Sequence, residues 1–83
     1  MQFVIHYSIA FEDEALSLAR RLFAYFDEQI DSLALSPDDQ DELNLYLDGT
    51  LLHSYRQSGR VPRVSDATTA IARTQEAHAE SAN

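Results

Sequence analysis

Two apolar runs meet at Asp48-Gly49, and this feature limits the possible folds more than any other. The segment 42–56 reads ELNLYLDGTLLHSYR, with leucine at every second position before the Asp-Gly pair. Such a pair supplies the two positive φ angles that a two-residue hairpin turn needs. The segment therefore predicts two antiparallel strands in which Leu45 faces Leu52 and Asn44 faces His53.

The chain before this hairpin changes its hydrophobic period twice. Residues 2–7, QFVIHY, alternate as in a strand, and residues 11–30 carry apolar side chains at helical spacing with three acids in the first turn. Residues 32–36, SLALS, predict a second short strand, and Pro37 is expected to open a polar loop.

After the hairpin, residues 57–63, QSGRVPR, predict a loop, and residues 65–80 predict a closing helix with Ser65 or Asp66 as its N-cap. The element order is then β-α-β-β-β-α. A right-handed crossover makes the first two strands parallel. We expect an α/β two-layer sandwich, with a four-stranded mixed sheet and both helices on one face. Residues 1–79 form its single domain, and residues 80–83 form a frayed tail.

Charge and composition narrow the range of partners. The chain has 83 residues and a net charge of −8, its basic residues are all arginine, and it has no cysteine. A net negative charge disfavours nucleic acid and anionic membranes because their phosphates would be repelled. The start lacks the pattern of a signal peptide, and no apolar run approaches the roughly 20 residues that span a bilayer. We expect a cytoplasmic protein with neither nucleic-acid nor membrane partners.

Several short motifs resemble, in their order and spacing, the selenoprotein W, T and H-like (Rdx) family of thioredoxin-fold proteins. They are the strand residues Phe3, Ile5 and Tyr7, the stretch Leu43-Asn44-Leu45, the turn Asp48-Gly49, and the loop Gly59-Arg60-Val61-Pro62. The resemblance covers about Phe3 to Pro62 and implies a thioredoxin-like fold. It requires the chain after Tyr7 to enter a helix beside the loop around Pro62.

In that family a Cys-x-x-Cys or Cys-x-x-Sec motif stands where the first strand passes into the helix. The matching positions here are Ser8 and Phe11. A dithiol cycle needs one thiol to attack and another to resolve, and neither is present. The neighbouring acids would also oppose a thiolate. We therefore expect a redox-inactive member without cofactor or catalytic residues, with Ser8 capping or approaching the helix start.

Two surfaces are candidates for binding a protein partner. The first is the vestigial active-site rim with its loop, which consists of Tyr7, Ser8, Phe11, Arg56, Gly59, Arg60, Pro62 and Arg63. Arginine is enriched at interface hot spots, although clustered arginines equally fit surface charges that balance an acidic chain. The second is the sheet face without helices, which consists of Val4, His6, Tyr46, Leu51, His53 and Tyr55. Simple exposure of that face, or cover from the C-terminal segment, is the alternative.

Metal binding and nucleophilic catalysis have less support in the sequence. His6 and His53 are predicted on strands separated by a third, about 9–10 Å apart by the usual interstrand spacing, which is too far for one metal ion. A nucleophilic pair of Ser8 and His6 lacks an orienting acid and an oxyanion hole. Phe11 anchors a partner if it is exposed and packs the first helix turn if it is buried.

The leading hypothesis is thus a non-redox, thioredoxin-like protein-binding or adaptor module. One alternative is a thiol-independent enzyme or glutathione-type ligand binder that uses the same rim. The other is a structural homodimer.

Overall fold

The structure is a computed structural model that describes residues 1–38 and 41–81, with side chains in the last helix described as far as Thr74. Its elements follow one another in the expected order, with short helical turns added. They are β1 (Gln2–Ser8), the 3-10 turn η1 (Ile9–Phe11), α1 (Glu12–Phe26), the 3-10 turn η2 (Asp27–Gln29), β2 (Ser32–Asp38), β3 (Leu43–Leu47), β4 (Thr50–Ser54), α2 (Tyr55–Ser58) and α3 (Val64–Ser81).

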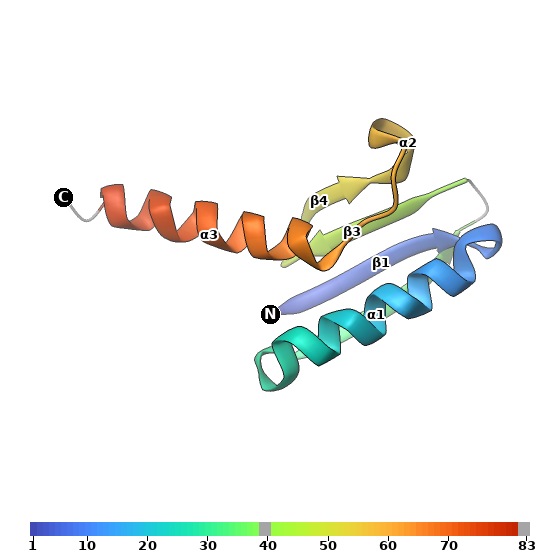
Figure 1. Cartoon of the computed structure of the whole chain (residues 1–83), viewed down its shortest axis with the longest axis horizontal. Coiled ribbons are helices and arrows are strands. Elements are labelled where there is room, and N and C mark those ends of the chain that lie inside the picture. The colour runs from blue at the N-terminus through green and yellow to red at the C-terminus, as the bar shows by residue number, and fades with distance from the viewer. Residues whose placement is uncertain (39–40, 82–83) are drawn as a thin grey trace.

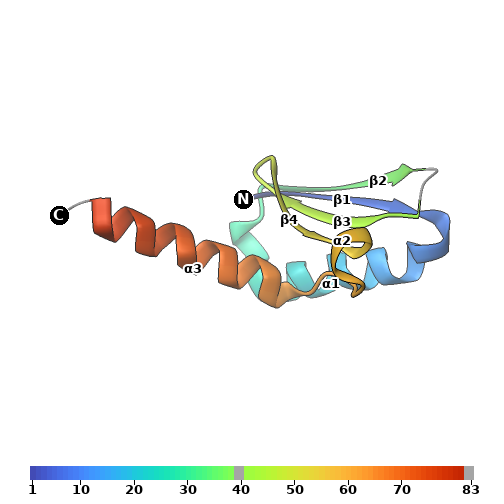
Figure 2. The ribbon, with the colours of Figure 1, turned by 90° about the horizontal axis from the view of Figure 1, so that it is seen from above.

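The four strands form one mixed sheet in the order β2-β1-β3-β4. β1 pairs in parallel with β2 and antiparallel with β3, and β3 pairs antiparallel with β4. Figure 2 shows the sheet as one layer with α1 and α3 together on one side of it. The predicted fold class, an α/β two-layer sandwich with both helices on one face, is confirmed.

The core lies between α1 and the two central strands. It is made of Phe3, Ile5, Ala15, Leu18, Ala19, Leu22, Phe26, Leu43, Leu45 and Ala67. Phe3 and Phe26 join the two layers through rings whose centroids are 5.6 Å apart. α3 contributes little to this core, because Ala67 is its only buried apolar side chain within the described part of the chain. The second half of α3 projects beyond the sheet (Figure 1) and lengthens the molecule to 46 Å.

The hairpin turn forms as predicted. Asp48 and Gly49 take positive φ angles of 50° and 84°. The carboxylate of Asp48 accepts a hydrogen bond from the backbone N–H of Gln2 at 2.9 Å, and the Asp48 N–H donates to the Gln2 carbonyl at 2.8 Å. The turn is thus tied to the first residue of β1, which fixes the register of the central strand pair.

The register beyond the turn differs from the prediction. Tyr46 pairs with Leu51, but Leu45 pairs with His53 and Asn44 pairs with Ser54. The predicted pairs of Leu45 with Leu52 and of Asn44 with His53 are wrong, because Leu52 is the extra residue of a β-bulge. A bulge reverses the alternation of side chains beyond it. His53 therefore lies on the helix-covered face, beside the buried Leu45.

Three element boundaries also differ from the prediction. Pro37 lies inside β2 rather than opening a loop, and β2 tolerates it because it is an edge strand. The expected start of the loop forms the helical turn α2, which ends at Gly59 with a φ of 78°. α3 begins at Val64, so neither Ser65 nor Asp66 is its N-cap.

The C-terminal helix runs to Ser81, two residues into the expected tail 80–83, and residues 82–83 lie outside the described residues. Within the described ranges, no helix combines the length and apolar character needed to cross a membrane.

The core predicts a contrast between two leucines of α1. Leu22 is fully buried, whereas Leu16 is 41% exposed. Leu22→Ala removes packed side-chain volume and is expected to lower the free energy of unfolding by about 2–5 kcal/mol. Leu16→Ala, the matched control, is expected to cost less than about 1 kcal/mol. Urea unfolding followed by circular dichroism measures both, and equal losses would contradict this placement of α1.

Candidate functional site

The junction after β1 carries the positions that the resemblance singled out. Ser8 ends β1, and the 3-10 turn η1 follows before α1 begins at Glu12. Ser8 directly precedes η1, as expected of a residue that approaches the helix start, but its side chain makes no capping hydrogen bond. Ser8 is only 6% exposed, and its Oγ has no hydrogen-bond partner among the described residues. A hydroxyl enclosed in this way is not presented to a substrate.

Phe11 is half-buried and packs against Tyr55, with ring centroids 4.8 Å apart and planes 54° from parallel. Tyr7 is half-buried as well, and all three side chains border the core. Phe11 therefore joins the rim to α2 through this ring contact, and a part of its side chain stays accessible. Tyr55 does not lie on the open sheet face, because β4 ends at Ser54 and Tyr55 begins α2.

Ile9 is a large exposed apolar residue beside this rim, and it was not predicted from the sequence. It lies in η1 and is 79% exposed. The signal was present in the segment YSIAF, where an isoleucine stands in a strand-to-helix turn outside both apolar patterns.

The loop after α2 returns to the side of α1, as the resemblance requires. A hollow of about 290 Å³ separates them and is lined by Asp13, Glu14, Ser17, Leu18, Arg21, Val61 and Pro62. Pro62 is buried apart from its part in lining this hollow, whereas Gly59 is exposed at the end of α2.

The predicted arginine patch is divided in the structure. Arg56 and Arg63 are exposed. Arg60 instead forms a two-point ion pair with Asp66, at 2.7 Å and 3.1 Å, and also donates to the Val61 carbonyl. The backbone N–H of Arg63 donates to the same carboxylate at 2.8 Å. Arg60 is therefore a structural residue that attaches the loop to the first turn of α3.

This arrangement changes the titration of the carboxyl group. Burial by itself raises the pKa of Asp66, but the hydrogen bonds from Arg60 and the Arg63 backbone, with the charges of His53 and Arg60, outweigh it. The pKa of Asp66 is lowered as a result. The same hydrogen bond raises the pKa of the Arg60 guanidinium.

His53 completes the group of polar side chains around Asp66. Its Nε2 lies 2.7 Å from Ser58 Oγ and 3.1 Å from the Arg60 carbonyl, and its Nδ1 lies 3.8 Å from Asp66 Oδ1. The Ser58 hydroxyl is also within hydrogen-bond distance of the Ser54 carbonyl, at 2.8 Å. We call His53, Ser58, Arg60 and Asp66 the polar clasp.

The clasp contains the residue types of a Ser-His-Asp triad, but its geometry serves another purpose. A working triad needs a hydrogen bond between the acid and the histidine and a histidine nitrogen free to accept the serine proton. Here Nδ1 is too far from the carboxylate, and Nε2 faces a carbonyl that can only accept. The Asp66 carboxylate is already occupied by Arg60. The group therefore joins β4, the loop and α3.

The open sheet face keeps some of its predicted members. Val4, His6 and Tyr46 are half-buried there and Leu51 is 40% exposed, with His6 and Tyr46 in edge contact at 5.2 Å. His53 and Tyr55 are absent from it. His6 and His53 are on opposite faces, and no group of three metal-binding side chains gathers within the described ranges.

The sheet order and the helix beside the Pro62 loop define a thioredoxin-like α/β fold. Among solved structures, a selenoprotein W-related protein from Vibrio cholerae shares it with a TM-score of 0.73 and 23% identity, covering 82% of this chain and 88% of that one. A protein from Bordetella parapertussis shares it with a TM-score of 0.75 and 17% identity, covering 88% of this chain and 95% of that one. No protein-family model matches the sequence, and no curated protein matches it significantly. The fold expected from the resemblance is thus confirmed.

The lowered pKa of Asp66 predicts how stability depends on pH. A carboxyl group with a lowered folded-state pKa stabilises the protein above its unfolded pKa of about 3.9, and this contribution is lost as pH falls through the folded pKa. Asp66→Asn is expected to lower the urea midpoint at pH 7, and its difference from wild type shrinks below about pH 4.

The control is Asp41→Asn, which removes an exposed carboxylate from the segment before β3. Its urea midpoint is expected to stay close to that of the wild type at pH 7 and below about pH 4. A constant difference between Asp66→Asn and wild type from pH 7 to pH 3 would contradict the ion pair.

Proposed function

We propose that this chain is a cytoplasmic, redox-inactive, selenoprotein W-like protein that works as a protein-binding module. The observation that carries the proposal is the chemistry at the junction after β1. The chain has no cysteine, and the two positions that match the family's redox pair are a buried serine and a phenylalanine packed on Tyr55. A thioredoxin-like scaffold without a thiol has no means of dithiol exchange, which leaves its surfaces to interact.

The rim around Ile9 is the best-supported contact surface. Ile9 is highly exposed beside the half-buried Phe11, and three exposed acids, Glu12, Asp13 and Glu14, follow at the start of α1. An apolar side chain surrounded by charge is the arrangement of an interface anchor with a polar border. The acids favour a partner that presents basic side chains around an apolar pocket, because opposite potentials attract across an interface.

The first test concerns thiol chemistry. The purified protein is expected to leave the rate of insulin reduction by dithiothreitol at its buffer value. Replacing Ser8 and Phe11 by cysteine together provides the comparison, since it restores the residue types of the dithiol cycle. Turnover by the wild-type protein would overturn the proposal, and saturable binding of glutathione in a calorimetric titration would favour the ligand-binding alternative.

The second test concerns the rim. Ile9→Ala removes an exposed side chain, so the fold is expected to persist. Loss of an interface anchor of this kind is expected to weaken partner binding by about 1–2 kcal/mol, roughly 5–30-fold in affinity. Affinity capture from the source organism's lysate, with bound proteins quantified, measures the loss. Leu16→Ala, a similar change on the outer side of α1, is the matched control. Equal retention by wild type and Ile9→Ala would remove the rim from the proposal.

A further inference from the structure

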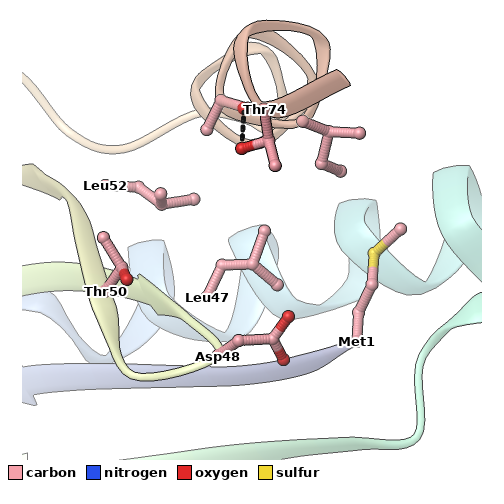
Figure 3. Close-up of a pocket in the computed structure, with 8 residues that line it drawn as sticks. Met1, Leu47, Asp48, Thr50, Leu52 and Thr74 are labelled. Atoms are coloured by element: carbon pink, nitrogen blue, oxygen red, sulfur yellow. Dashed lines mark hydrogen bonds between the residues drawn. The ribbon is translucent and has the colours of Figure 1, made fainter. Parts of the chain in front are cut away.

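Two hollows lie along α3 and share two of their lining residues. The first has a volume of about 460 Å³ and lies between α3, the β3–β4 hairpin and the start of β1, as Figure 3 shows. The second has a volume of about 380 Å³ and lies between α3, β4 and the loop. Leu52 and Ala70 line both. We call the combined feature the α3 groove.

The first hollow is the apolar end of the groove. It is lined by Met1, Leu47, Asp48, Thr50, Leu52, Ala70, Ile71 and Thr74. Two of its polar side chains are already engaged, because the Asp48 carboxylate accepts from the Gln2 N–H and the Thr74 hydroxyl donates to the Ala70 carbonyl. Figure 3 shows Leu47, Leu52 and Met1 beneath α3 in this space. An aliphatic chain would be desolvated here against Leu47, Leu52 and Ile71, while the paired Asp48 and Thr74 groups keep their hydrogen bonds.

The second hollow is the polar end. Ser65, Thr69 and Arg73 follow one another at intervals of four residues, so they share one side of α3. Arg60 lines the same hollow but its guanidinium is held by Asp66. Arg73 is exposed and has no ion-pair partner in the part of the chain that the structure describes. The hydroxyls of Ser65 and Thr69 make no hydrogen bond with that part of the chain either.

The charge at the polar end decides which kind of ligand the α3 groove can bind. Among the residues that the structure describes, Asp66 is the one carboxylate that lines the polar end, and Arg60 neutralises it, so Arg73 leaves an excess of positive charge there. A guanidinium with hydroxyl donors beside it fits a carboxylate, and an aliphatic surface begins where Leu52 and Ala70 join the hollows. Each hollow by itself has the volume of an ordinary small-molecule site.

We propose that the α3 groove binds a single-chain fatty carboxylate, with its head group at Arg73 and its chain between Leu47, Leu52 and Ile71. This site is separate from the rim around Ile9, so it adds a ligand to the proposed binding module. A cationic or neutral amphiphile of the same length would gain the apolar contacts alone.

Isothermal titration calorimetry with sodium decanoate, below its critical micelle concentration, tests the proposal. Saturable binding is expected, together with amide shifts at Leu52 and Ala70 in nuclear magnetic resonance spectra. Shortening the chain is expected to weaken binding by up to about four-fold per methylene that loses contact. Decyltrimethylammonium is expected to bind at least ten-fold more weakly. No saturation by decanoate, or equal binding of the two amphiphiles, would overturn the proposal.

Two charge reversals locate the head group. Arg73→Glu is expected to weaken decanoate binding at least five-fold, whereas Arg20→Glu, an exposed arginine on α1 that lines neither hollow, is expected to change it less than two-fold. Both variants alter the net charge equally, so equal losses would mean long-range repulsion and would overturn the site. Circular dichroism checks that both variants remain folded. A peptide with a C-terminal leucine that binds in place of decanoate would also count against the proposal.

Discussion

The carboxylate of Asp66 joins the final helix to the rest of the chain. α3 offers small side chains to the sheet, with Ala67 buried and Val64 and Ile71 only partly so, and small side chains remove little apolar area from water. Asp66 compensates by accepting hydrogen bonds from the Arg60 side chain and the Arg63 backbone. One polar group thereby positions the loop, the beginning of α3 and both hollows of the groove.

The β-bulge makes this carboxylate site possible. Without the extra residue at Leu52, strict alternation would put His53 on the open face, away from Asp66. The bulge instead places His53 beside Leu45, where its two ring nitrogens reach toward Asp66 and Ser58. The sequence could not decide this register, because Leu51 and Leu52 are adjacent leucines and either can face the core. The turn at Asp48-Gly49 was predictable because it depends on local backbone preferences alone.

The same difference between local preferences and long-range contacts explains which parts of the site were predictable. The strand-to-helix junction and the return of the loop to α1 follow from local patterns and element order, and both were expected. The pairing of Arg60 with Asp66 was not, because Asp66 equally fits the local pattern of an N-cap. Ile9 was overlooked for a related reason. Its exposure depends on the conformation of η1, in which Phe11 packs against the core while Ile9 is exposed, and no periodic pattern encodes this.

Charge is unevenly divided along the chain, and the division separates the two proposed binding surfaces. Most acids precede Leu43, whereas the chain from Leu43 onward carries as many arginines as acids. The rim around Ile9 is thus in the acidic part and favours a basic protein surface, while the α3 groove is in the balanced part and can attract a carboxylate despite the net charge of −8. Screening at physiological salt limits the reach of charge to about 8 Å, so local side chains decide what each surface attracts. Because the two surfaces favour ligands of opposite charge, neither ligand would compete directly for the other's site.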